Sequence, residues 1–241
     1  MYYVYGDESI VDDTVVYGVV IAPQTQVEEI ETIIKEVKLS YRASPTVRFH
    51  CRQIFHHDTR RKSAWSHLSE IQCHQMATDL TVGLGGKGLL TTIGHLTSRE
   101  ARKVLPSVGQ HHEVEIENIK QLVPFAFVAA IGPVALDPKF KKQIKLWVDP
   151  DSSMVKWWGG NRQAQRLLSI GEMNFELLKR VDEVVPQNLQ TKETPTLLEI
   201  ADLLSYSSAR ALAKRGKPYD YVFEDILRLI APVQYPFKWM D

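Results

Sequence analysis

The chain opens with two apolar runs of strand-forming residues, one over residues 1–6 and one over residues 15–21. The first run contains three tyrosines and the second contains four valines, and a polar turn at residues 12–14 lies between them. Alternating or continuous apolar runs joined by turn-forming residues are typical of adjacent strands. We therefore expect the N-terminus to form the first hairpin of a sheet on which the remaining elements pack.

Asp7 and Glu8 directly follow the first apolar run, and they allow two interpretations. As carboxylates at the end of a rigid strand they would suit a divalent metal, because Mg²⁺ takes hard oxygen ligands in near-ideal geometry. As turn residues they would simply be solvated. Short motifs of this kind are weak by themselves, so the choice depends on where else the chain presents carboxylates.

The composition indicates one globular domain. The chain has 241 residues, of which 44% are hydrophobic and 24% are charged, enough for a sizeable core. We expect a single domain over residues 1–241, with insertions near 40–65 and 151–180. The 29 basic and 29 acidic residues give zero net charge, which argues against bulk electrostatic capture of nucleic acid but not against a local basic stretch.

The cellular setting is predicted from cysteine usage and apolar runs. Cys51 and Cys73 are the only cysteines and show no framework spacing, which predicts a reducing, cytoplasmic environment. The N-terminus lacks the pattern of a signal peptide. The longest apolar stretch, residues 122–136, is broken by proline and glycine, so we expect a buried helix and no membrane association.

Residue periodicity predicts helices and strands that alternate along the chain, which is typical of an α/β fold with a mixed sheet and flanking helices. A capping box over Thr25–Glu28 should start the first helix, and Pro124 should kink a later one. Helices are expected over 25–41, 66–84, 98–105, 115–131 and 195–214 and near 218. Strands are expected over 47–50, 89–94, 144–148 and 181–185.

Two further elements present carboxylates. Asp149 ends the apolar run 144–148. In the late helix, Glu199, Asp202 and Tyr206 share one face of a helix that is apolar almost all round. A carboxylate there must be protonated, hydrogen-bonded, paired or bound to a cation. The ordinary alternative is a salt bridge to Arg210, to Lys214 or to the basic stretch before residue 62.

Acids that converge from two strands and one packed helix are what a two-metal phosphoryl-transfer site requires. Neither ion would be held tightly by protein alone, so a substrate phosphate should complete the coordination. We therefore expect Mg²⁺ or Mn²⁺ as the cofactor.

The motifs that carry these acids resemble a known family. They are Gly6-Asp7-Glu8-Ser9, Phe49-His50, Val148-Asp149 and the run Glu199-Ile200-Ala201-Asp202-Leu203-Leu204-Ser205-Tyr206. In this order they resemble the bacterial family catalogued as domain of unknown function 3800, which is grouped with the ribonuclease H-like fold. The resemblance spans nearly the whole chain and implies a mixed-sheet, nuclease-like domain.

The resemblance also implies roles for the acids. Asp7 would be the central ligand between two metals, with Asp149 as a strand-end ligand and Asp202 as the late-helix ligand. Glu8 and Glu199 would be secondary, as ligands or as support for the ligands. In ribonuclease H an acid from the helix after the third strand completes the site, and here the choice stays open among Glu113, Glu115 and Glu117.

A basic stretch adjoins the Phe49-His50 motif. His50 could act as a general acid or base or contact phosphate, or it could simply be hydrogen-bonded at a strand end. The stretch is a candidate track for a nucleic-acid backbone, and its alternative is a solvated face with salt bridges. The residues of this track are Arg48, Arg52, Arg60, Arg61 and Lys62.

Two classes of function follow. The first is a metal-dependent nuclease-like phosphodiesterase, a hydrolase of RNA or DNA, with a nucleotide phosphatase as a variant of the same chemistry. The second is a non-catalytic binding or assembly module that works with a partner protein or as a regulator of a phage-defence or mobile-element system. The partner would be another protein or a second copy of the chain in a homo-oligomer. Carboxylates that converge on a solvent-facing point would favour the enzyme, whereas an arginine that fills this point would favour the module.

Overall fold

The structure is a computed structural model that describes residues 1–104, 119–140, 144–150, 152, 189–190, 192, 194–213, 216–230 and 233–234. It is an α/β fold built on a mixed six-stranded sheet in the order β5-β4-β1-β2-β3-β6. The central strands β1 and β2 pair antiparallel, and β4 pairs parallel with β1. The strands are β1 (Tyr2–Val11), β2 (Thr14–Pro23), β3 (Leu90–Thr97), β4 (Ile144–Val148), β5 (Leu189–Gln190) and β6 (Val233–Gln234).

The predicted N-terminal hairpin is present, but its first strand is longer than expected. β1 continues to Val11, so Asp7 and Glu8 lie in the middle of a central strand, where Asp7 faces Gly18 of β2. The turn needs only Asp12 and its neighbour, and Asp12 adopts the left-handed conformation with φ 54 that hairpin turns favour. The expectation that strand one ends at these acids is therefore wrong.

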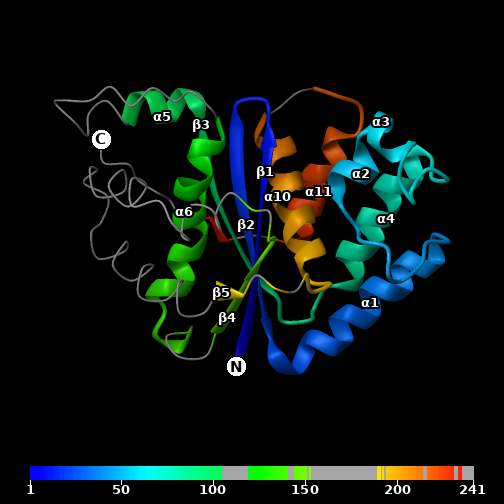
Figure 1. The fold of residues 1–241 in the computed structure, drawn as a ribbon, viewed down its shortest axis with the longest axis horizontal. Coiled ribbons are helices and arrows are strands. Elements are labelled where there is room, and N and C mark those ends of the chain that lie inside the picture. Colours follow the sequence, from blue (N-terminus) through cyan, green and yellow to red (C-terminus); the bar gives the residue numbers. More distant parts are fainter. Residues whose placement is uncertain are drawn as a thin grey trace.

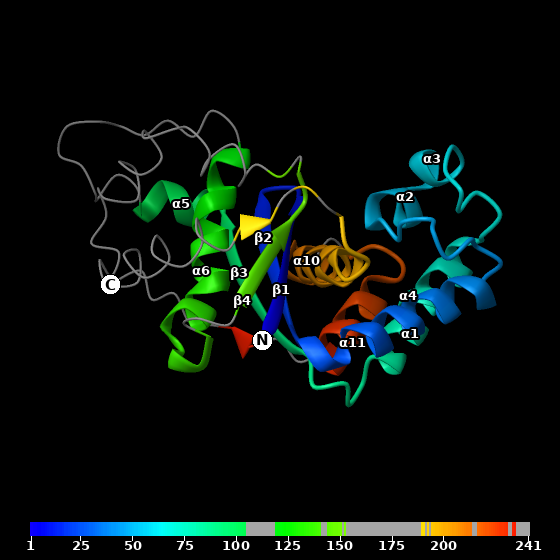
Figure 2. The same ribbon diagram turned by 60° about the horizontal axis from the view of Figure 1, so that its bottom comes forward.

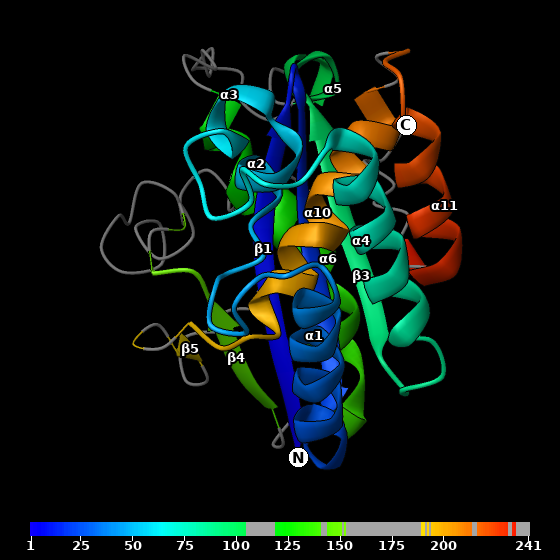
Figure 3. The same cartoon turned by 90° about the vertical axis from the view of Figure 1, so that its right-hand side faces the viewer.

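Helices cover both faces of the sheet (Figure 1). On one face lie α5 (Ser98–Val104) and α6 (Val123–Leu136), the latter preceded by the short η3 (Ile119–Leu122). On the other face α10 (Leu198–Ala213) lies directly against β1 and β2. Figures 2 and 3 show an outer layer beyond α10. The long helices of this layer are α1 (Val27–Ser40), α4 (Glu70–Gly83) and α11 (Asp220–Ile230).

Each face of the sheet has its own apolar core, and alternation along β1 and β2 assigns their residues to one or the other. Tyr5 and Val16 belong to the core under α10, whereas Val4 and Tyr17 belong to the core under α6. The segment Ile119–Leu136 is long and apolar enough to cross a membrane, but most of it is buried in the second core. It therefore serves as a core helix of the sheet, as predicted for residues 122–136.

Several helix boundaries differ from those predicted. The expected capping box over Thr25–Glu28 is absent, because a 3-10 turn, η1 (Gln24–Gln26), precedes α1 and no side chain caps it. A capping box instead starts α4, between Ser69 and Gln72. Pro124 lies in the first turn of α6, where its missing N–H costs nothing, so it produces no kink in mid-helix.

The insertion expected near 40–65 falls in the segment that connects α1 to α4, and this segment contains α2 (Cys51–Phe55) and α3 (His57–Arg60). Residues 47–50 do not form the expected strand. The strand expected at 181–185 and the insertion near 151–180, except Ser152, lie outside the described residues.

Candidate active site

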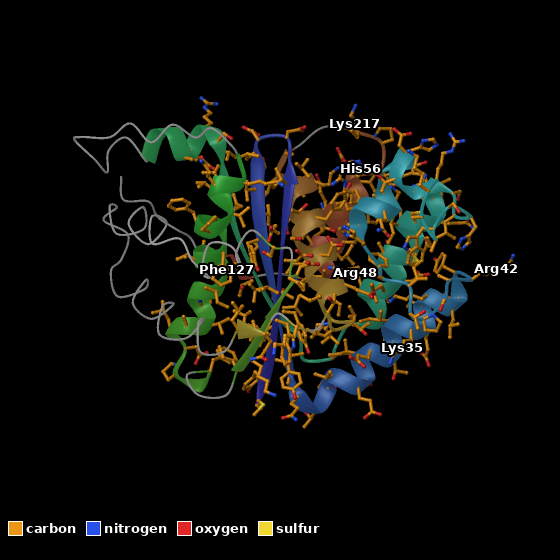
Figure 4. The ribbon with its side chains drawn as sticks, in the orientation of Figure 1. Lys35, Arg42, Arg48, His56, Phe127 and Lys217 are labelled. Carbon is orange, nitrogen blue, oxygen red and sulfur yellow. The ribbon has the colours of Figure 1, made fainter. Side chains whose placement is uncertain are left out.

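Arg48, whose position Figure 4 labels, lies between two of the predicted metal ligands. Its Nη1 donates to Oδ2 of Asp149 at 2.7 Å, and its Nη2 is 3.9 Å from Oδ2 of Asp7. β1 and β4 pair in parallel with Gly6 opposite Val148, so the two acids are the next residues on neighbouring strands. The structure thus brings Asp7 and Asp149 together, with a guanidinium between them.

Asp202 comes to the same region from α10. Its Oδ2 accepts a hydrogen bond from the Cys51 backbone N–H at 2.8 Å and lies 2.8 Å from Nδ1 of His50. Asp202 is buried, as the apolar surroundings of its helix predicted. One partner of this carboxylate, His50, belongs to the segment 47–50, and the other, Cys51, is the first residue of α2.

The acids carry more negative charge than Arg48 can balance. Burial raises the pKa of Asp7 well above its ordinary value, and the neighbouring Asp202 and Glu8 raise it further. The Glu8 backbone N–H, which donates to Asp7 Oδ1 at 2.8 Å, and Arg48 oppose this shift. Asp7, Asp149 and Asp202 thus place three carboxylates around one guanidinium, which is the electrostatic environment in which a divalent cation binds favourably.

Glu8 lies on the other face of the sheet. It faces Tyr17 across the hairpin, and the Ser152 hydroxyl donates to Glu8 Oε2. Tyr17 is fully buried, and its ring meets that of Phe127 edge to face at 4.9 Å. Sequence reasoning missed Tyr17 and Ser152, because only the register shows that a tyrosine of β2 lies beside this acid.

Glu199 forms a buried ion pair with Lys38. Lys38 Nζ lies 2.8 Å from its Oε1 and 2.7 Å from its Oε2, and both residues are buried. Burial raises the pKa of Glu199 to about 6, and Lys38 opposes the shift. In this structure Glu199 joins α10 to α1 rather than facing Asp7 and Asp149. The predicted salt bridge exists, but its partner is none of those expected, and Arg210 pairs with Asp220 instead.

Lys38→Met is expected to destabilise the protein by about 3 kcal/mol, because it leaves the Glu199 carboxylate buried without its cation. Urea unfolding followed by circular dichroism measures this loss. The double variant Lys38→Met/Glu199→Gln should recover much of it, because the buried charge is then removed as well.

The matched control for this pair is Lys35→Met on the same helix. Lys35 is exposed and pairs with Glu31 at 3.6 Å, so its loss should change stability by less than about 1 kcal/mol. Equal effects of Lys35→Met and Lys38→Met would contradict a special role for the buried pair.

The predicted nucleic-acid track divides into three parts. Arg48 lies among the acids. Arg60 is buried and donates from Nη1 to the Ile54 carbonyl at 2.7 Å, so it supports α2 and α3 and does not face solvent. Arg52, Arg61 and Lys62 are exposed, and they remain candidates for contact with a polyanion.

The donor chemistry suits a hard divalent cation, because the converging groups are carboxylate oxygens with surplus negative charge. The carboxylate oxygens are not arranged as the ligands of a bound metal ion. Within the described ranges, no three His, Cys, Asp or Glu side chains are grouped as a ligand set. Arg48 occupies the space between Asp7 and Asp149, so a metal ion would have to displace its guanidinium. Glu113, Glu115 and Glu117 lie outside the described residues.

Comparisons with protein-family models, with curated proteins and with solved structures found no match to this chain. The resemblance to a family therefore stays an expectation drawn from its motifs. The carboxylates, the arginine and the histidine that the fold brings together are the features that indicate a function.

Proposed function

We propose that this protein is a nuclease-like phosphodiesterase that cleaves RNA or DNA with Mg²⁺ or Mn²⁺. The observation that carries the proposal is that Asp7, Asp149 and Asp202, from three different elements, border one arginine with negative charge in excess. The proposal includes a ribonuclease H-like domain of the family catalogued as domain of unknown function 3800. A mixed sheet with helices on both faces is compatible with that fold.

Asp7 and Asp149 would hold the cation, with Asp202 as the ligand from α10. When bound, the cation would activate the attacking water and neutralise charge on the leaving oxygen. Arg48 would neutralise the scissile phosphate. Asp202 engages Nδ1 of His50, which orients the ring and leaves Nε2 as the nitrogen for a proton transfer.

Solvent access supports the enzyme. The side chains of Arg48 and Asp149 are 32% and 20% exposed, and that of His50 is 37% exposed, so a phosphodiester can approach these three residues. The exposed Arg52, Arg61 and Lys62 would then contact neighbouring phosphates of the same strand.

A non-catalytic binding or assembly module is the second candidate, and Arg48 itself favours it. The guanidinium fills the point where Asp7 and Asp149 meet, which is the arrangement expected of acids that are satisfied internally. In such a module the acids would stay paired with Arg48, and a partner protein or a second copy of the chain would be the ligand.

Cation dependence distinguishes these functions. We expect the purified protein to cut RNA or DNA with Mn²⁺ or Mg²⁺ and to be inactive with a chelator. Asp149→Asn should lower cleavage at least about 100-fold, because it removes a cation ligand. The control is Asp58→Asn, whose side chain is 97% exposed. Undiminished cleavage by Asp149→Asn or in chelator would refute the metal mechanism, and binding without cleavage would favour the module.

The proposed location is the cytoplasm. It is supported by the two cysteines, Cys51 and Cys73, which are both buried and not joined by a disulfide. Reducing conditions preserve thiols in this state.

A further inference from the structure

The Nε–H of Arg48 is buried and donates no hydrogen bond to either of the two acids that contact this side chain. Nη1 and Nη2 face Asp149 and Asp7, whereas Nε is buried and lacks a hydrogen-bond partner among the described residues. A buried N–H without an acceptor is destabilising, because it has lost its hydrogen bonds to water. The arrangement with two carboxylates therefore does not satisfy this side chain fully, and an additional oxygen acceptor would stabilise it.

A phosphodiester has the oxygens that such a guanidinium needs. Arginine donates two parallel hydrogen bonds to two oxygens of one phosphate group, and Nε and one Nη form such an edge. The backbone of Arg48 is held in place, because Trp65 Nε1 donates to its carbonyl oxygen at 3.3 Å. Its side chain is partly exposed and can rotate about several bonds, so only the guanidinium needs to move.

We propose that Arg48 makes the binding of a divalent cation and of a phosphodiester cooperative. Before substrate binds, Arg48 is the counterion of Asp7 and Asp149 and competes with the cation for their oxygens. When a phosphodiester binds, the guanidinium turns to the phosphate and releases the two carboxylates to the cation. This inference rests on the proposed function, since it assumes that these acids hold a divalent cation.

Linkage fixes the sign of the effect. If a phosphodiester raises the affinity for the cation by some factor, the cation raises the affinity for the phosphodiester by the same factor. A protein of this kind would hold its cation weakly alone and firmly with substrate. Typical couplings lie between about 5-fold and 150-fold, and we expect about tenfold here because solvent partly screens the site.

The test measures Mn²⁺ binding by electron paramagnetic resonance, with and without saturating dimethyl phosphate, the smallest phosphodiester. A protein-free titration corrects for Mn²⁺ bound by the probe itself. Wild type should bind Mn²⁺ about tenfold more tightly with the probe. Arg48→Met should bind Mn²⁺ about tenfold more tightly than wild type without the probe, and the probe should then change its affinity less than about twofold.

Two further variants keep the test decisive. Arg48→Lys retains the charge but cannot donate two parallel bonds, so it should bind Mn²⁺ like wild type without the probe and lose most of the coupling. Arg48→Lys therefore tests the coupling even if Arg48→Met fails to fold. The matched control is Arg42→Met, because Arg42 is exposed and lies far from Arg48 (Figure 4), and it should behave as wild type in both titrations.

The outcomes separate this inference from the function on which it rests. Tight Mn²⁺ binding by wild type that neither the probe nor Arg48→Met changes overturns the cooperative role of Arg48 and leaves the metal-dependent nuclease standing. Absence of Mn²⁺ binding by wild type and by both Arg48 variants, with and without the probe, overturns both proposals. Coupling that Arg48→Lys retains in full would also exclude the bidentate phosphate contact.

Discussion

Asp7→Asn is expected to abolish cation-dependent cleavage and, in the same protein, to raise thermal stability. The Asp7 carboxyl is buried, and burial together with Asp202 and Glu8 disfavours its charge. Asparagine has nearly the same shape and retains an oxygen that can accept the Glu8 N–H. Removing the buried charge should stabilise the fold by about 2 kcal/mol, or about 4–8 °C in Tm for a chain of this size.

The effect should depend on pH in a defined direction. Because burial and neighbouring acids raise the pKa of Asp7 in the folded protein above its value in the unfolded chain, folded wild type binds the proton more tightly. The contribution of Asp7 to the free energy of unfolding is therefore fully present below the carboxyl pKa of the unfolded chain. It is lost as the pH rises through the raised pKa of Asp7 in the folded protein. The advantage of Asp7→Asn should vanish near pH 4 and grow toward pH 8.

Thermal unfolding by circular dichroism between pH 4 and pH 9, together with the cleavage assay, tests both halves of the prediction. Asp58→Asn, at an exposed carboxylate, should change neither Tm nor cleavage measurably. If Asp7→Asn proves less stable than wild type at pH 8, then the attraction between Asp7 and Arg48 outweighs the repulsion among the acids, and the internally paired module gains support.

Gly94→Ala should prevent stable folding. Gly94 lies in β3 under α6, and a Cβ there would be 2.6 Å from the Ala130 backbone N, 2.7 Å from the Ala129 Cβ and closer still to the Ala126 carbonyl oxygen. Two of these are backbone atoms of a helix, so relief requires α6 itself to shift. Thr92 Oγ1 donates to the Ala130 carbonyl at 2.5 Å and holds α6 against the sheet.

The expected cost is about 4 kcal/mol or more, which is exceptional for adding one methyl group. Tm should fall by about 8 °C or more, or the protein should be recovered only in insoluble form. Gly86→Ala is the control, because nothing lies within 4 Å of a Cβ at this exposed turn. Alanine at the left-handed φ of +75 should cost about 1–2 kcal/mol and no more, because there is no steric clash. A Gly94→Ala protein with the Tm of wild type would show that α6 packs less closely than described.

Local patterns in the sequence predicted much of the framework. The apolar runs predicted the hairpin β1–β2 and the strand β4, and apolar composition predicted the buried helix α6. The burial of Asp202 also followed from the sequence, because a helix without a polar face has no other place for an acid. These features depend on a residue and its near neighbours, which the periodicity of the chain records directly.

The partners of the acids could not be predicted in this way. Asp149 pairs with Arg48 across 101 residues, Glu199 with Lys38 across 161, and Asp202 with His50 across 152. Periodicity tells which face of an element is buried, but not which distant side chain will lie against it. The segment 47–50 is an example: it was expected to be a strand, but it is irregular, and its Arg48 and His50 side chains contact acids far away in the sequence.

The sequence alone thus determined that Asp149 follows an apolar strand and that Asp202 lies on a buried helix. Only the tertiary structure decided that Asp7 lies in mid-strand, that Glu8 faces the opposite side of the sheet, and that Arg48 stands among the acids. The physical reason is that the register of β1 against β2 and β4 fixes where each side chain points. This register is set by the packing of both faces together, which no single stretch of the chain contains.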